Sequence, residues 1–206
     1  TLSTGGTNKI AAATLTISGY LGSASVTIAT DAAATNSSVK KVAADINAVK
    51  DSTGIEATAI TKGKIASVNT AGVISFDLIG KQADGAAATA YDVTATLAST
   101  ADLDPLVDAI NAHSANTGVT AILGATAAEI ILTHQTGENI ELDAVSIGGG
   151  TAGTMILHSL DKFGNAAGGA DTTLNRTAGG VFTVSVGNAA TGTASASGFI
   201  MGQMTL

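Results

Sequence analysis

Residues able to perform acid–base or metal chemistry are few in this chain and widely spaced. The three histidines are His113, His134 and His158, and no two of them have the i, i+4 spacing that places both rings on one helix face. The local patterns put them at a helix end, at a strand end and within a strand. We interpret each as a surface or packing residue. Cysteine is absent, which excludes disulfides, thiolate metal sites and a cysteine nucleophile.

Carboxylates and glycines give no catalytic pattern either. The triple glycine Gly148–Gly150 is followed by Thr-Ala rather than by Gly-Lys-Ser/Thr, so it is not a phosphate-binding loop. No serine lies in a G-x-S-x-G turn. The acidic residues are scattered along the predicted strands, and the sequence singles out no pair for acid–base work: Asp77, Asp84, Asp92, Glu129, Glu138, Glu141 and Asp143. The sequence predicts no catalytic, cofactor-binding or metal site, and a protein that is not an enzyme.

The composition favours thin β-sheets. Of 206 residues, 45% are hydrophobic but only 3% are aromatic, with no tryptophan, so the core must consist of small and β-branched side chains. There are 25 glycines and one proline. Charged residues make up 12%, and the net charge is −7. A chain so poor in lysine and arginine lacks the basic surface that nucleic acids require. It also has no apolar run of eighteen residues, which a membrane-spanning helix would require. We therefore expect neither nucleic acid nor membrane as a partner.

Hydrophobic periodicity predicts an α+β, β-rich fold of antiparallel sheets with two short amphipathic helices. Helical spacing is confined to residues 37–50 and to a segment that begins at Asp104-Pro105 and ends before Gly118. The first helix has Asn36, Ser37 or Ser38 as its N-cap, and the second has Asp104. Alternation elsewhere predicts strands at 13–19, 24–30, 55–60, 64–68, 73–79, 91–97, 119–123, 129–134, 139–146, 154–160, 181–186 and 198–206. Residues 80–90, 165–170 and 187–192 are predicted loops.

The two helices belong to a repeat. Segment Leu106–Ala121 reproduces Val42–Ala57 without gaps at an offset of 64 residues, from the helix through a Thr-Gly turn into a strand. Each isoleucine lies on the apolar stripe of its helix. We expect the neighbouring asparagine to hydrogen-bond the backbone of the turn, and the glycine to end the helix in the left-handed conformation. The matching residues, our structural-motif candidates, are Ile46, Asn47, Thr53 and Gly54, then Ile110, Asn111, Thr117 and Gly118.

Both segments resemble the IN motif of bacterial flagellins, which also occurs in filament-cap and hook-associated proteins. Typically a short helix containing Ile-Asn precedes a Thr-Gly-Val turn and a β-hairpin, and Ile55 replaces valine in the first copy. The resemblance implies the central variable outer-domain region of a flagellin. It implies an extracellular structural protein of the bacterial flagellum with no cofactor. Its partners would be neighbouring flagellin subunits, with O-linked glycan on exposed hydroxyls. The alternative is an exposed binding or adhesion domain of a cap or hook-associated protein.

The sequence also suggests a domain organisation. Neither end carries the long heptad-patterned helices by which flagellins polymerise, so we interpret the chain as part of a longer subunit. Strands are predicted on both sides of the second repeat and need partners. Residues 1–85 together with 150–206 would therefore form one β-rich domain containing the first repeat, with residues 86–149 inserted as the second. A simple tandem order is the alternative.

Overall fold

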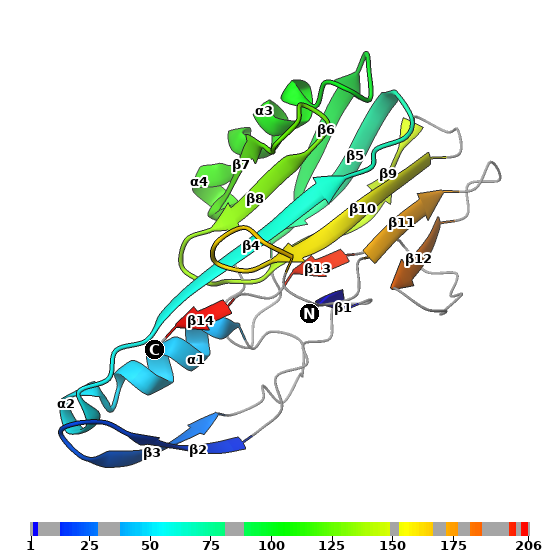
Figure 1. Cartoon of the computed structure of the whole chain (residues 1–206). Helices are drawn as coiled ribbons and strands as arrows, with labels where there is room; N and C mark the ends of the chain where they lie inside the picture. The colour runs from blue at the N-terminus through cyan, green and yellow to red at the C-terminus, as the bar shows by residue number, and fades with distance from the viewer. Residues whose placement is uncertain are drawn as a thin grey trace.

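The computed structural model is a β-rich protein with short helices (Figure 1). It describes residues 2–3, 13–28, 38–80, 89–148, 153–166, 172–176, 182–186, 198–200 and 203–205. The helices are α1 (Val39–Asn47), α2 (Lys50–Thr53), α3 (Asp104–Ala112) and α4 (Ser114–Thr117). The strands are β1 (Leu2–Ser3), β2 (Ala13–Ser18), β3 (Ser23–Ile28), β4 (Thr58–Ala66), β5 (Gly72–Ile79), β6 (Tyr91–Leu97), β7 (Val119–Leu123), β8 (Ile130–His134), β9 (Ile140–Ser146), β10 (Gly153–Leu160), β11 (Thr172–Arg176), β12 (Phe182–Val186), β13 (Gly198–Ile200) and β14 (Gln203–Thr205).

The strands form three antiparallel sheets. The five-stranded sheet has the order β1-β13-β9-β5-β6, and the seven-stranded sheet has the order β12-β11-β10-β4-β8-β7, with β14 beside β4. The hairpin β2–β3 is a two-stranded sheet of its own. Strand β4 is unusually long because its first residues pair with β14 and its last residues pair with β8 and β10. The predicted fold class is confirmed.

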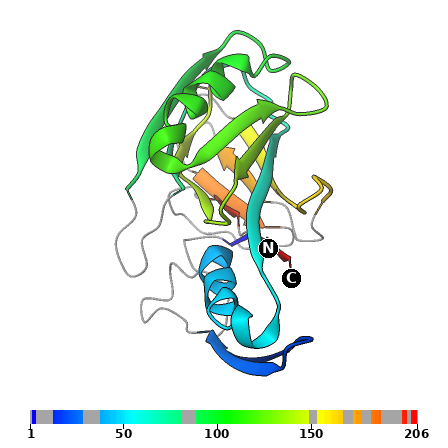
Figure 2. The same ribbon diagram turned by 90° about the vertical axis from the view of Figure 1, so that its left-hand side faces the viewer.

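The main hydrophobic core contains residues from both large sheets and from α3. Its largest fully buried members include Phe76, Leu97, Leu106 and Ile130. Helix α3 contacts β6, an edge strand of the five-stranded sheet, and β7, an edge strand of the seven-stranded sheet. In Figure 2 this green helix lies between strands of the two sheets. The apolar stripe of α3 therefore covers the main core between the edge strands β6 and β7.

A second, smaller core lies under the hairpin β2–β3. Helix α1 places Val42 and Ile46 against Ile17 and Val26 of the hairpin and against the start of β4. An isolated two-stranded sheet is marginal in water unless something packs on its apolar face, and α1 supplies that packing. Figure 1 shows the hairpin beside α1 and away from the two large sheets. The first repeat thus has a core of its own.

Several expected boundaries are wrong. The strands predicted at 55–60 and 64–68 are the single strand β4, because Lys62 and Lys64 keep the alternation unbroken. Asp104 is not an N-cap: α3 begins at Asp104 itself, and its backbone N–H donates to the carboxylate of Asp102. The helix predicted from Asp104-Pro105 to Gly118 is divided into α3 and α4, a short helix α2 follows α1, and strand β11 was not predicted. Ser38 caps α1 through Lys41 N, as one of three predicted candidates.

Some predictions concern residues outside the described ranges. Most of the predicted loop at 80–90, the whole of 187–192 and Gly149–Gly150 lie there. The division into 1–85 with 150–206 and an inserted 86–149 stays a prediction. The large core draws on β4, β5 and β10 as well as on strands between 86 and 149, so this packing favours no boundary at residue 86. No helix among the described residues is long and apolar enough to span a membrane.

Candidate functional site

The asparagine of each repeat joins its helix to the strand that follows. Asn47 Nδ2 donates to the carbonyl of Ala57 at 2.9 Å, and the Ala57 N–H donates to Asn47 Oδ1 at 2.8 Å. Asn111 and Ala121 repeat this geometry with the same two distances. The side-chain amide thus satisfies one donor and one acceptor of the backbone, as a neighbouring strand would. The expected partner was the Thr-Gly turn; the actual partner lies three residues beyond its glycine.

The threonine of each repeat fastens the turn itself. Thr53 Oγ1 donates to the carbonyl of Val49 at 3.1 Å and accepts from the N–H of Ile55 at 3.2 Å. In the second copy, Thr117 bonds the carbonyl of His113 and the N–H of Val119 in the same way. Both threonines are buried. Each buried hydroxyl therefore both donates and accepts a hydrogen bond within the turn.

The glycine of each repeat is required by conformation and by space. Gly54 and Gly118 both have φ of 74°, in the left-handed region where a side chain is strained. A Cβ on Gly54 would collide with the ring of Tyr20, and one on Gly118 would lie 2.5 Å from Nε2 of His134. The two copies therefore share a backbone conformation but have different aromatic covers.

The repeated unit begins earlier than the sequence analysis placed it. Gly19 follows β2 and Gly80 follows β5, and each approaches the carbonyl of the motif threonine so closely that a Cβ would not fit. Each unit is therefore a hairpin, a helix, a Thr-Gly turn and a strand: β2 to β4 in the first copy, β5 to β7 in the second. In the sequence, only a weak signal indicates this earlier start: Gly19 and Gly80 each follow an alternating strand, and they lie 61 residues apart.

The histidines lie apart and have packing roles. His134 is buried against Gly118, and its Nδ1 is 3.2 Å from Thr136 Oγ1. The His113 ring lies 5.7 Å from that of Tyr91, and His158 lies in β10 opposite Lys64 of β4. Among the described residues, no group of three histidines or carboxylates could hold a metal ion.

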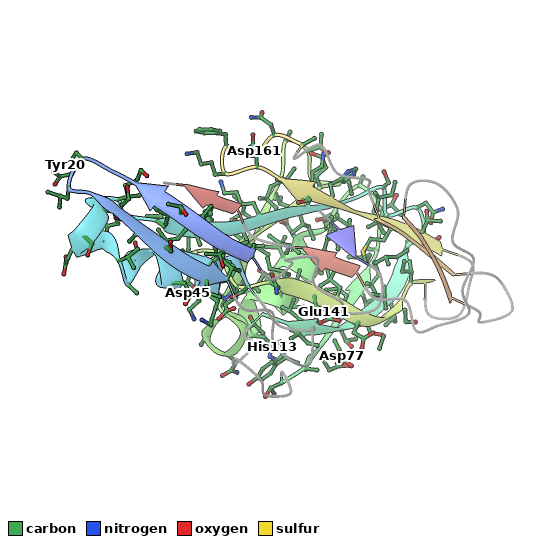
Figure 3. The ribbon with its side chains drawn as sticks, turned by 90° about the horizontal axis from the view of Figure 1, so that it is seen from below. Tyr20, Asp45, Asp77, His113, Glu141 and Asp161 are labelled. Atoms are coloured by element: carbon green, nitrogen blue, oxygen red, sulfur yellow. The ribbon has the colours of Figure 1, made fainter. Side chains whose placement is uncertain are left out.

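Sheet pairing brings together carboxylates that are far apart in the sequence. Asp92 of β6 lies opposite Asp77 of β5, which lies opposite Asp143 of β9. Glu141 precedes Asp143 by two residues, on the same face of β9. Burial, and secondarily the charge of Asp143, raises the pKa of Glu141. In contrast, a 2.8 Å hydrogen bond from Lys64 lowers the pKa of Glu129. Figure 3 labels Asp77 and Glu141.

The asparagine and threonine side chains of both motifs thus bind the protein's own backbone. Comparison with protein families gives two matches to the flagellin hook IN motif, at residues 14–72 and 73–136, together more than half of the chain. Each match begins in the first strand of a hairpin, β2 or β5, and so covers the unit that the structure repeats. A comparison with curated proteins finds no match. Flagellins are structural, non-enzymatic proteins of the bacterial flagellum that assemble into filaments. This chain belongs to the flagellin hook IN motif family.

Proposed function

We propose that this chain is the surface-exposed, variable part of a flagellar filament subunit. The observation that carries the proposal is the pair of family matches. In agreement with a structural role, the asparagine side chains of both motifs form hydrogen bonds within the protein. The two repeats form a β-rich structure suited to projecting outward and contacting neighbouring subunits. Polymerisation belongs to long helices elsewhere in the subunit. The chain would then contribute to the filament surface and its antigenicity.

The exposed hydroxyls of the hairpin β2–β3 support a further part of this proposal, O-linked glycan. Thr14, Thr16 and Ser18 of β2 and Ser25 and Thr27 of β3 are all exposed. Glycan on such positions would not disturb either core, because these side chains point away from α1. Intact mass measurement of the protein from its native source would show the added hexose-type increments, and peptide mapping would assign them.

Antibody labelling tests the location on the filament. Antiserum raised against the folded chain should label intact, undenatured filaments along their whole length. Preimmune serum and filaments from a strain lacking the subunit serve as controls. Labelling only after dissociation of the filaments would contradict surface exposure. Unaided growth of filaments from the purified chain would contradict the proposal that polymerisation lies elsewhere.

A second candidate function is the exposed binding domain of a cap or hook-associated protein. It is favoured by Tyr20, whose exposed ring borders a cavity of about 290 Å³ that is also lined by Lys50, Asp51 and Glu56. An aromatic face beside carboxylates is suited to a sugar ring. Labelling confined to the filament tip or to the hook junction, together with saturable binding on a glycan array that Tyr20→Ala abolishes, would support this function over the first.

A further inference from the structure

The two hairpins can be compared position by position. Gly19 and Gly80 make the same close approach to the motif threonine, so they are equivalent. Counting back from them, Ile17 of β2 corresponds to Leu78 of β5, and Leu15 corresponds to Phe76. Both strands alternate in the same phase, with Ile17 and Leu78 buried. The hairpin β2–β3 is therefore the counterpart of β5–β6.

The surroundings of the two hairpins differ at one edge. Strand β5 pairs with β6 on one side and with β9 on the other. Among the described residues, β2 pairs with β3 alone. The consequence is visible in burial, because Phe76 is 1% exposed whereas its counterpart Leu15 is 37% exposed. The first repeat thus presents an edge and an apolar position that the second repeat covers with an antiparallel strand.

The hairpin β2–β3 also lacks the features that normally protect an edge. Natural edge strands are commonly shielded by charged side chains, proline or bulges. Residues 13–28 contain no charged residue and no proline, and the six pairs of the β2–β3 ladder run without a bulge. At the turn, Tyr20 is 85% exposed and Leu21 is 56% exposed, and Figure 3 shows Tyr20 at one end of the molecule.

We propose that the edge of β2 pairs antiparallel with β2 of a second copy of this chain, giving a four-stranded sheet across the two copies. This inference rests on the proposed function, since a filament subunit is surrounded by its own copies. An antiparallel edge is complementary to itself under a two-fold axis, the commonest symmetry of protein pairs. With Leu15 opposite the partner's Leu15, each Thr14 lies opposite the partner's Thr16. Apolar side chains then meet apolar ones on one face, and hydroxyls meet hydroxyls on the other.

The pairing is expected to be weak for the free chain. A six-residue strand buries far less than the 1,200 Å² or so of a standard stable interface. Subunits held in one filament experience an effective concentration on the order of millimolar, which favours contacts too weak to form in dilute solution. Pairing through β2 therefore links outer domains that assembly has already brought together, and it ends at two copies because the axis closes.

Cysteine cross-linking tests the geometry, since the chain has no cysteine of its own. Residues directly opposite in an antiparallel pair have Cα atoms about 4.5–5.5 Å apart, within the range of a disulfide. At roughly millimolar chain concentration under mild oxidation, Leu15→Cys should form a covalent dimer at least about tenfold faster than Val73→Cys. Val73 is the control because it is similarly exposed, at 40%, but lies in β5, which pairs with β6 and, from Ser75 onward, also with β9.

A charge placed on the edge provides the second test. In the Leu15→Cys background, Thr16→Lys should suppress the cross-link, because a lysine on an edge strand disfavours pairing with another strand, and each lysine would lie opposite the partner's Thr14. Thr27→Lys adds the same charge to the same face of the hairpin but on β3, so it should leave cross-linking intact. Equal circular dichroism spectra and melting temperatures of the two lysine variants show that both are folded.

Hydrogen exchange of the unmodified chain completes the experiment. The amides of residues 13–18 should gain protection as the chain concentration rises, at least severalfold between micromolar and millimolar. Protection that is already complete in the monomer would show that the chain's own residues occupy the edge, and would overturn the proposal. So would equal cross-linking of Leu15→Cys and Val73→Cys. Unaided filaments would instead refute the proposed function, and they are distinguished from dimers by sedimentation.

Discussion

The asparagine of the motif contributes more than an ordinary helix residue because its amide serves two backbone groups at once. The N–H and C=O of Ala57 lie directly before β4, and those of Ala121 lie in the middle of β7, each three residues beyond the glycine of its turn. Water reaches these groups poorly, since Ala57 and Ala121 are both buried. An unpaired buried amide group costs its full desolvation free energy. Alanine or leucine at this position would leave both backbone groups without this partner.

Replacing this asparagine tests its role at the residue scale. Asn111→Ala should lower the free energy of unfolding by about 1–3 kcal/mol, because Ala121 loses both hydrogen bonds. Asn47→Ala should cost a similar amount, but locally, in the small core under the hairpin β2–β3. Urea unfolding and amide exchange of α1 and α3 would measure the two effects. Asn116→Ala is the matched control: Asn116 is exposed, and a change there should stay within about 0.5 kcal/mol. A loss no larger for Asn111→Ala than for this control would refute the role.

At the scale of elements, the five-stranded sheet carries a row of like charges. Asp92, Asp77 and Asp143 lie opposite one another on three adjacent strands, and like charges placed this way destabilise a sheet. Glu141 lies beside this row and is partly buried, which raises its pKa. The folded protein therefore binds the proton of Glu141 at pH values where the unfolded chain has already released it.

The raised pKa of Glu141 determines the direction in which stability changes with pH. The contribution of Glu141 to stability is fully present below its ordinary pKa of 4.5 and is lost as the pH rises through the raised pKa of the folded protein. At neutral pH, Glu141→Gln should therefore make the protein more stable, because the glutamine carries no charge to desolvate. This advantage should shrink as the pH falls toward 4.5. Urea unfolding between pH 4 and pH 7 measures it, with the exposed Asp108→Asn as control. A constant advantage at every pH would contradict the assignment.

At the scale of the whole molecule, the first turn of α1 joins the small core to the large one. The Lys40 N–H donates to the carbonyl of Gly137 at 3.2 Å, and Lys40 Nζ lies 2.9 Å from Glu138 Oε1. Thr61 Oγ1 donates to the carbonyl of Glu138. The Glu138 side chain is only 7% exposed, and its Oε2 has no hydrogen-bond partner among the described residues. Lys40 is therefore the main compensation for a nearly buried charge that links α1 to the connection between β8 and β9.

A two-residue cycle tests this junction. Lys40→Met leaves the carboxylate of Glu138 uncompensated and should lower stability by about 1–2 kcal/mol, a value reduced because Lys40 is half exposed. Adding Glu138→Gln removes the charge and should restore part of that loss. Amide exchange of α1 relative to α3 would locate the effect at the junction. The partly exposed i, i+4 pair of Lys41 and Asp45, which leaves no buried carboxylate behind, gives the comparison, since Lys41→Met should cost only about 0.3–0.5 kcal/mol. A double variant as unstable as Lys40→Met would contradict the model.

Much of the local structure was predictable because it depends on neighbours in the sequence. The helical period of residues 37–50, the left-handed glycines 54 and 118 and most strand positions follow from side-chain spacing and backbone sterics. The repeat followed from direct comparison of the two segments. The predictions failed where the local sequence pattern allowed two alternative structures. The capping of α3 is one case, since Asp102 rather than Asp104 serves its first turn. The merging of two predicted strands into β4 is another.

The sequence by itself therefore determined the fold class, the two motifs and their relation to flagellins. Only the tertiary structure decided which strands are neighbours, and with them the partner of each motif asparagine, the row of aspartates and the open edge of β2. The physical reason is that short strands of alternating threonine, alanine and valine fit one another in many orders and registers. The choice among them depends on packing between residues far apart in the chain. It is this packing that gives two related repeats different surroundings, one hairpin covered by β9 and the other left with a free edge among the described residues.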